Sequence, residues 1–183
     1  SKVESVTESP DAVSVSLSSG DTLSADLVLV SVGRGPRTDG LGLIEQGIAT
    51  ERGFVSVDDN LLTTVDGVYA VGYIVAGYQL AHRGFQHGMF VAEHIAGLAP
   101  ARIDGDLIPR VTYSHPEVAS VGLTEKAAEQ KYGTVTSVVY DLGGNGKSRI
   151  LSTAGGVKVI RARDDGPVVG VHLVGDRVGE LIG

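Results

Sequence analysis

Residues 143–148, Gly-Gly-Asn-Gly-Lys-Ser, form the segment whose composition most directly suggests chemistry. In a phosphate-binding loop, backbone N–H groups and a Lys hold phosphate oxygens, and the loop ends in Gly-Lys-Ser or Gly-Lys-Thr. That motif also requires a Gly where this chain has Asp141, and a helix directly after the loop. Residues 149–155 do not follow a convincing helical pattern. We therefore interpret the segment as a flexible connection between strands.

The titratable residues indicate no catalytic group and no metal site. His115-Pro116-Glu117 places an imidazole near a carboxylate in sequence, but Pro116 between them is more typical of a turn. His82 and His87 are five residues apart and therefore point to different sides of a helix. The chain contains no Cys, so it has no thiol, disulfide or thiolate metal ligand of its own.

Composition indicates a folded, acidic chain. Of its 183 residues 42% are hydrophobic, and its net charge of −7 disfavours a nucleic-acid groove. Apolar runs such as residues 27–30 are far shorter than the ~20 residues of a membrane span, and we expect a cytoplasmic protein with no membrane or nucleic-acid partner. The first residue is Ser1, and an apolar pattern is still running at Leu181 and Ile182, so we expect part of a longer protein.

Short strands and one long helix are expected in the first hundred residues. Alternating apolar residues predict a half-buried strand over residues 12–17, and the apolar run of residues 25–32 predicts a strand covered on both faces. Further short strands are expected over residues 54–57 and 68–72, and a helix over residues 79–98. Spacing of three and four residues predicts the inward face of that helix, which is Phe85, Met89, Ala92 and Ala96.

After a polar, proline-containing boundary at residues 101–110, the pattern becomes that of an α+β unit. Thr124 is the expected cap of a helix over residues 124–132, and Gly133 its expected end. Strands are expected over four segments, residues 111–113, 135–140, 156–161 and 168–174. Gly166-Pro167 predicts that the last two form an antiparallel hairpin.

One predicted strand–loop–helix unit favours a ligand site. Its strand ends at Gly72, and its helix begins near Gln79. Helix N-termini carry unpaired N–H groups, and α/β proteins bind ligands beside the carboxyl ends of strands. An ordinary strand–helix unit without a ligand explains this pattern equally well.

Three motifs in this first part resemble those of the dihydrolipoyl dehydrogenase family of flavoprotein disulfide oxidoreductases. Residues 32–36, Val-Gly-Arg-Gly-Pro, resemble the end of the family's NAD domain. Thr63 followed by residues 68–72, Val-Tyr-Ala-Val-Gly, resembles its second FAD-binding motif. Residues 80–82, Leu-Ala-His, resemble the start of the helix that follows that motif.

Two later motifs, in residues 108–122 and 170–182, resemble the interface domain of the same family, so the resemblance covers nearly the whole chain and points to the C-terminal portion of a member. It implies an α/β fold of a two-dinucleotide-domain flavoprotein followed by an α+β interface domain. Residues 1–35 would end the NAD-binding domain, residues 36–105 would be the returning C-terminal part of the FAD-binding domain, and residues 106–183 a truncated dimerisation domain.

The resemblance also implies a function and a set of cofactor contacts. It implies an FAD- and NAD-dependent homodimer that oxidises lipoyl groups of 2-oxo acid dehydrogenase complexes and passes electrons through a redox disulfide and FAD to NAD. Gly33 would lie against the NAD ribose, and Gly72 would end the flavin motif. The expected backbone contacts to the flavin come from Gln79, Leu80, Ala81 and His82.

Two departures from the family pattern limit these expectations. Tyr73 stands where the motif has an Asp that binds a ribityl hydroxyl of FAD, so we expect weakened FAD binding. The family's redox Cys pair, its two Gly-x-Gly-x-x-Gly motifs and its catalytic His-Glu pair lie outside these 183 residues, so the chain alone is expected to be inactive. The alternatives are a glutathione- or mercury-reductase-like member and an inactive dimerising scaffold.

Overall fold

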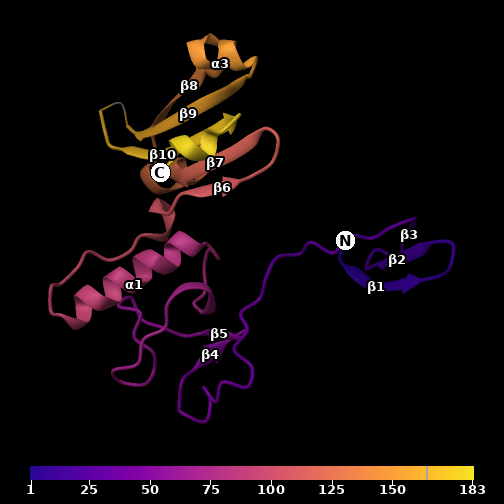
Figure 1. Ribbon diagram of the computed structural model, residues 1–183, viewed down its shortest axis with the longest axis vertical. Helices are drawn as coiled ribbons and strands as arrows, with labels where there is room; N and C mark the ends of the chain where they lie inside the picture. The colour runs from indigo at the N-terminus through magenta and orange to yellow at the C-terminus, as the bar shows by residue number, and fades with distance from the viewer. Residues whose placement is uncertain (164) are drawn as a thin grey trace. The chain divides into compact units, whose positions relative to one another are not determined.

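The computed structural model describes residues 1–163 and 165–183, which form two compact units, residues 1–35 and 36–183 (Figure 1). The first unit is an antiparallel three-stranded sheet in the order β1-β2-β3. Its strands are β1 (Val3–Glu8), β2 (Val13–Leu17) and β3 (Thr22–Ala25). The strand expected over residues 12–17 is thus confirmed, whereas β1 was not foreseen.

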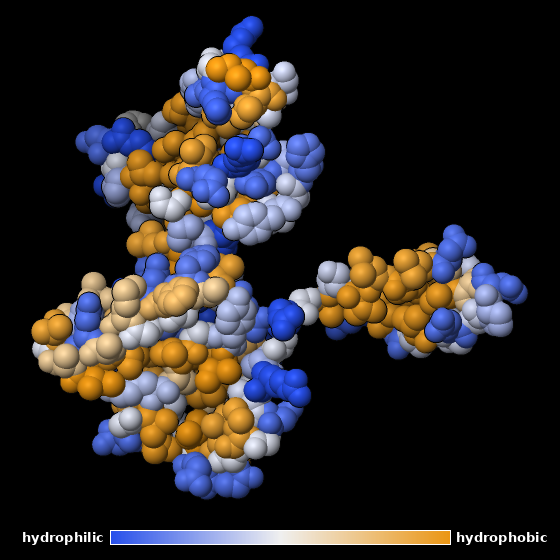
Figure 2. Space-filling view, in the orientation of Figure 1, coloured by the Kyte–Doolittle hydropathy of each residue, from blue (hydrophilic) through white to orange (hydrophobic). Residues whose placement is uncertain are grey.

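The buried strand expected over residues 25–32 is wrong. Strand β3 ends at Ala25, and Leu27, Leu29 and Val32 are 83%, 84% and 92% exposed. Figure 2 shows apolar side chains on the surface of this unit in orange. A strand forms only where a neighbouring strand takes up its N–H and C=O groups, and no described segment pairs with residues 27–32.

The second unit begins with short elements around a small core. These are β4 (Thr50–Glu51), β5 (Phe54–Val55), the 3-10 turn η1 (Gly72–Ile74) and helix α1 (Ala81–Ile95). The core residues are Val55, Leu61, Ala70, Val75 and Phe90. Strand β5, with two residues, is shorter than the strand expected over residues 54–57.

The strand expected over residues 68–72 is also absent from the described structure. Tyr69 makes a single antiparallel bridge with Leu62, and the Thr63 N–H donates to the Val68 carbonyl at 2.8 Å. The segment thus satisfies its backbone locally by folding back on residues 61–63. Gly72 then starts a 3-10 turn, because its positive φ of 73° is incompatible with a continuing strand.

Helix α1 is shorter than the helix expected over residues 79–98, and it packs by a different face. Phe85 and Met89 are 74% and 61% exposed, and Ala92 and Ala96 are exposed as well. The buried residues are Arg83, His87 and Phe90. The apolar spacing was misleading because Arg83 and His87 find backbone partners in the adjoining loop, which makes their burial possible.

An antiparallel five-stranded sheet, in the order β6-β7-β10-β9-β8, forms the rest of the second unit. Its strands are β6 (Arg110–Thr112), β7 (Glu117–Gly122), β8 (Val135–Asp141), β9 (Gly155–Ala162) and β10 (Val168–Gly175). The four expected strands and the β9–β10 hairpin are confirmed, and β7 was not foreseen. The connecting elements are η2 (Gly105–Leu107), α2 (Glu125–Tyr132), η3 (Leu142–Gly144), α3 (Gly146–Leu151) and η4 (Val178–Leu181).

Helix α2 lies against this sheet and forms as expected. The Thr124 hydroxyl accepts the Ala127 N–H, and the helix ends at Gly133. Glu125 accepts hydrogen bonds from Ser137 of β8 and Lys158 of β9, so α2 is tied to two strands. A second core of Ala119, Leu173 and Val178 is buried within this part. No described helix is long and apolar enough to cross a membrane.

Candidate functional site at the start of helix α1

The Gly72–Tyr73 turn lies directly against the first turns of α1. A Cβ added to Gly72 would be 3.6 Å from the Gly84 Cα, and one added to Gly84 would be 3.5 Å from the Gly72 Cα. The two backbones therefore lie close together at a pair of glycines, with room for no more than an ordinary van der Waals contact of an added Cβ. The φ of 73° at Gly72 is a left-handed conformation that favours glycine.

Arg83 fixes the loop that joins this turn to the helix. Its guanidinium donates to the carbonyl oxygens of Val75 at 3.2 Å, Ala76 at 2.6 Å and Tyr78 at 3.1 Å. The loop wraps so closely that a Cβ on Gly77 would lie 2.9 Å from an Arg83 nitrogen. Arg83 is 8% exposed and forms no ion pair within the described residues, and burial lowers the pKa of its guanidinium below the usual value.

His87, one helical turn after Arg83, holds the turn itself. Its Nδ1 accepts the Gly72 N–H at 3.2 Å, which requires the proton of a neutral ring to be on Nε2. The ring is 3% exposed. Burial, and secondly the positive charge of Arg83, lower the pKa of His87 below its ordinary value of 6.5.

The N-terminus of α1 is uncapped, and its first residues are exposed. Leu80 is the N-cap residue, its side chain makes no capping bond, and Ala81 and His82 are exposed. The N–H groups of an uncapped first turn carry partial positive charge, and no acidic side chain lies in this turn to neutralise it. The end of the helix can therefore stabilise an electron-rich group.

Two side chains connect this end of the helix to the start of β6. His82 Nε2 donates to the Pro109 carbonyl at 2.7 Å. The Arg110 guanidinium lies 4.5 Å from the centre of the Tyr78 ring and donates to the Tyr78 hydroxyl. His82, expected to contact the flavin through its backbone, thus uses its side chain to fix the helix end.

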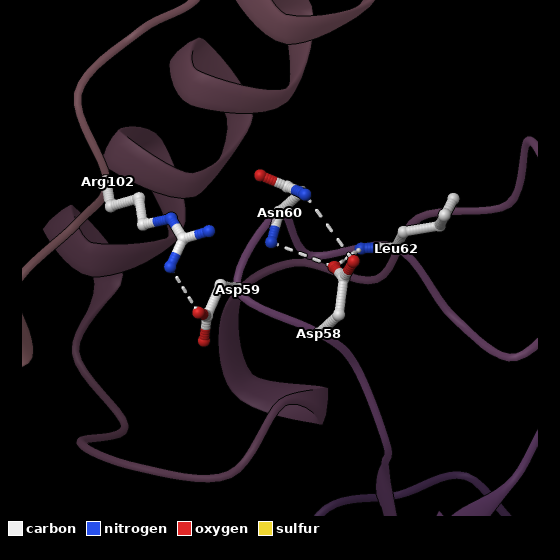
Figure 3. A network of polar contacts seen from close by, with 5 residues as sticks. All are labelled: Asp58, Asp59, Asn60, Leu62 and Arg102. Atoms are coloured by element: carbon white, nitrogen blue, oxygen red, sulfur yellow. Dashed lines mark hydrogen bonds and ion pairs between the residues drawn. The ribbon is translucent and has the colours of Figure 1, made fainter.

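A cavity of about 330 Å³ lies on the inner side of Arg83 and His87, between α1 and the loop around residues 57–61. Figure 3 shows the polar network at its edge, where Asp58 accepts the N–H groups of Asn60 and Leu62, and Asp59 pairs with Arg102. The hydrogen bond from Leu62 is the main cause of a lowered Asp58 pKa. Both carboxylates are therefore already engaged.

The structure brings together six of the seven residues expected to contact cofactors. These six are Gly72, Tyr73, Gln79, Leu80, Ala81 and His82. Gly33 belongs to the other compact unit, where its φ is 100° and no atom lies within 4 Å of an added Cβ. Arg83 and His87 were missed, although their spacing of four residues, continued by Phe90 after three more, marks one helix face.

The site fits a flavin in one respect and departs from it in another. The open helix N-terminus suits the pyrimidine edge of a flavin, on which negative charge develops during reduction. Tyr73 follows Gly72 with its ring 44% exposed, and a phenol replaces the carboxylate that the motif places there. The uncapped helix end is thus compatible with the predicted flavin contact, whereas Tyr73 does not supply the carboxylate that the motif predicts.

The remaining candidate segments carry no site. A helix does begin within residues 143–148, contrary to expectation, but α3 starts at Gly146 and has only six residues. Two N–H groups of this loop are taken by its own side chains, since Asp141 accepts from Gly143 and Asn145 from Lys147. Glu117 accepts the Gly179 N–H at 2.9 Å, and His115-Pro116 lies in a bend, as the turn interpretation predicts.

The turn held against a helix and the antiparallel α+β part that follows it agree with the C-terminal portion of a two-dinucleotide-domain flavoprotein, and the matches to known proteins confirm the α/β plus α+β fold class. Residues 1–88 match the profile of pyridine nucleotide-disulphide oxidoreductases, and residues 108–183 match that family's dimerisation domain. The chain belongs to the pyridine nucleotide-disulphide oxidoreductase family. The family assignment implies FAD and NAD as cofactors, as predicted.

Curated relatives and solved structures agree with this assignment. The chain is 41% identical over 182 residues to a dihydrolipoyl dehydrogenase of Bacillus subtilis, covering 97% of this chain and 38% of the relative. It is 37% identical to the mitochondrial dihydrolipoyl dehydrogenase 1 of Arabidopsis thaliana, covering 99% of this chain and 37% of the relative. The chain therefore spans about two fifths of the length of these relatives, and the predicted match to only part of a family member is confirmed.

Two structural neighbours have the same fold at 26% sequence identity. LpdA of Mycobacterium tuberculosis superposes with a TM-score of 0.86 over 99% of this chain and 40% of its own. The HOCl-induced flavoprotein disulfide reductase RclA of Escherichia coli, solved as a Cu(II) complex, gives 0.83 over 100% of this chain and 42% of its own. The division of residues 36–183 at residue 105 stays a prediction.

Proposed function

We propose that this chain provides the flavin-ring contact and the dimer interface of an NAD-dependent dihydrolipoyl dehydrogenase. The observation that carries the proposal is the Gly72–Tyr73 turn, held against the open N-terminus of α1 by the glycine contact and His87. The similarity to dihydrolipoyl dehydrogenases of two distant organisms supports the substrate class. The dimerisation-domain match supports a homodimer.

The chain's own residues would position the cofactors and leave the thiol chemistry to other parts of the protein. Backbone groups of Gln79, Leu80, Ala81 and His82 would contact the flavin, and the partial charge of the helix end would stabilise its reduced form. Gly33 would allow the backbone to approach the NAD ribose. A bound FAD would supply the two-electron transfer between a redox disulfide, reduced by the dihydrolipoyl dithiol, and NAD.

Because the chain contains no Cys, we propose that these 183 residues alone do not reduce NAD with dihydrolipoamide. The assay follows NADH formation by the purified chain and by the natural protein, whose intact mass is measured first. A mass of 18.9 kDa identifies the chain as the whole protein, and one about two and a half times larger matches the relatives' length. Turnover by the 183 residues without any Cys contradicts the proposal.

A disulfide reductase with another substrate is the second candidate, favoured by the TM-score of 0.83 to RclA. Assaying the natural protein with dihydrolipoamide and with oxidised glutathione separates the two.

We further propose lipoyl-bearing subunits of 2-oxo acid dehydrogenase complexes as partners, in the cytoplasm. Co-purification of the natural protein with these complexes from the soluble fraction tests this proposal. A dimer that binds no flavin would instead support the alternative of an inactive dimerising scaffold.

We propose that Tyr73 weakens FAD binding. A hydrogen bond to a charged group contributes about 1.5–3 kcal/mol, so restoring the acid in Tyr73→Asp is expected to tighten FAD binding by about ten- to a hundredfold. Calorimetric titration with FAD measures this in the natural protein. Tyr113→Asp, which adds the same charge at an 83% exposed tyrosine within the dimerisation-domain match, is the matched control. Equal affinity of Tyr73→Asp and the unaltered protein contradicts the proposal.

A further inference from the structure

His87 and Arg83 hold two successive parts of one loop. His87 accepts the N–H of Gly72 at the start of the loop, and Arg83 donates to the carbonyls of Val75, Ala76 and Tyr78 further along. The loop therefore depends on one acceptor and one donor that project from adjacent turns of α1. Arg83 keeps its charge at any ordinary pH, whereas His87 can change its charge.

The hydrogen bond to Gly72 exists only while His87 is neutral. A protonated imidazole carries hydrogens on both nitrogens and cannot accept the Gly72 N–H. The protonated Nδ1 of His87 and the Gly72 N–H, both donors, would then face each other around a ring that is only 3% exposed. Because Gly72 is followed by Tyr73 and lies beside Gly84 of α1, a displaced Gly72 moves the turn relative to the helix.

No charged group of the described residues is paired with the His87 ring. Arg83, on the same helix, opposes a second positive charge. Asp58 and Asp59 line the same cavity, but Asp58 accepts two backbone N–H groups and Asp59 pairs with Arg102, which also lines it. His94 lies further along α1, stacked on Phe90 with ring centres 6.0 Å apart.

We propose that His87 is a positioning residue whose neutral ring holds the Gly72–Tyr73 turn in the arrangement that receives the flavin, and that acid releases the turn. The link to the flavin rests on the function proposed above. The hold on the turn itself rests only on the contacts of His87, Gly72 and Gly84.

The direction of the pH dependence follows from the lowered pKa of His87. The ring is neutral and the hydrogen bond complete above the ordinary value of 6.5. As the pH falls below 6.5, the released state takes up a proton more readily than the intact turn, so the hold weakens progressively until the lowered pKa is passed. The loss of one hydrogen bond corresponds to about a two- to tenfold change in an equilibrium.

The first experiment needs no cofactor. The Gly72 amide of the 15N-labelled 183-residue chain is followed by NMR from about pH 7.5 to about pH 5, together with its hydrogen exchange. We expect a shift of this amide and a two- to tenfold loss of protection as the pH falls below 6.5. A Gly72 amide that does not titrate in the unaltered chain overturns the proposal.

Two variants separate the hydrogen bond from the packing of the ring. His87→Asn keeps an acceptor close to Nδ1 that does not titrate, so the Gly72 amide is expected to stay protected at both ends of the pH range. His87→Phe keeps the ring and loses the acceptor, so protection is expected to be low and independent of pH. If His87→Phe fails to fold, the comparison of His87→Asn with the unaltered chain tests the proposal. A Gly72 amide that still loses protection at low pH in His87→Asn overturns it.

The second experiment adds FAD to the natural protein and its variants. We expect the Kd for FAD to rise two- to tenfold between about pH 7.5 and about pH 5 in the unaltered protein and in the control His94→Phe, but not in His87→Asn. The same rise in His87→Asn overturns the role toward the flavin. A protein that binds no FAD at any pH, while its Gly72 amide still titrates, contradicts the proposed function and supports the hold on the turn.

Discussion

The sheet of β6 to β10 and the segment that follows β3 are both rich in apolar, β-branched residues and have opposite outcomes. In the sheet, Ile160 and Ala119 are completely buried and Leu173 is 4% exposed. After β3, Leu29 and Val32 are 84% and 92% exposed. The sheet finds all its partner strands between Arg110 and Gly175, whereas the described chain offers no partner to residues 27–32.

The difference shows that an apolar, β-branched sequence favours a buried strand, but that the strand forms only where the fold supplies a neighbouring strand and a surface to cover it. Hydrophobic burial and backbone pairing both need a second surface, and an antiparallel hairpin supplies one within a few residues. Residues 168–175 have such a neighbour in β9, through the hairpin at Gly166-Pro167. Residues 25–32 resemble a strand of a parallel sheet, whose neighbours lie far away in the sequence.

The largest expected effect tests how tightly the sheet is built. Gly122 of β7 has a φ of 78°, and a Cβ there would lie 2.2 Å from the Val169 carbonyl oxygen of the neighbouring chain segment. We expect Gly122→Ala to lower the free energy of unfolding by about 4 kcal/mol or more, because a strand backbone cannot move aside. Urea unfolding followed by circular dichroism measures the change.

Gly133→Ala is the matched control, since Gly133 has the same φ of 78° and no atom within 4 Å of an added Cβ. It should show only the cost of the backbone conformation and therefore a smaller loss than Gly122→Ala. Equal losses in the two variants would mean that β7 and β10 do not approach as closely as described.

The next largest effect tests burial in the sheet against exposure in the same part of the chain. Ile160 of β9 is completely buried, so Ile160→Ala is expected to cost about 2–5 kcal/mol through lost apolar contact and a residual cavity. Ile150→Ala removes the same atoms from a 79% exposed side chain and should change stability by less than about 0.5 kcal/mol. Thermal unfolding of both variants gives the comparison, and similar losses would refute it.

The availability of a local partner also decides which elements could be predicted from the sequence. The strands 135–140, 156–161 and 168–174 and the Thr124-capped helix were found because their partners and caps are local. The strand expected over residues 68–72 was wrong because Thr63 and Val68 bond to each other, which periodicity does not reveal. Strand β7 escaped notice beside a Pro and several polar residues.

The candidate site shows a related limit. The positions around Gly72 and residues 79–82 came from motif order, and the structure places them together. The inward face of α1 was wrong because the prediction assumed that apolar residues are buried, whereas Arg83 and His87 are buried with hydrogen-bonded partners. A buried polar face depends on which backbone groups lie opposite, and this is a property of the folded loop.

The smallest expected effect concerns the segment that found no partner. Leu29→Ser removes an apolar side chain that is 84% exposed, so the free energy of unfolding of the 183-residue chain should change by less than about 0.5 kcal/mol. Binding of a hydrophobic dye should fall, because the exposed apolar surface of this unit decreases. Val15→Ser of β2, at 9% exposure, is the control in the same unit and should destabilise its sheet. A loss of about 2 kcal/mol in Leu29→Ser would mean that residues 27–32 are buried in the chain by itself, and would remove the contrast with the β6–β10 sheet.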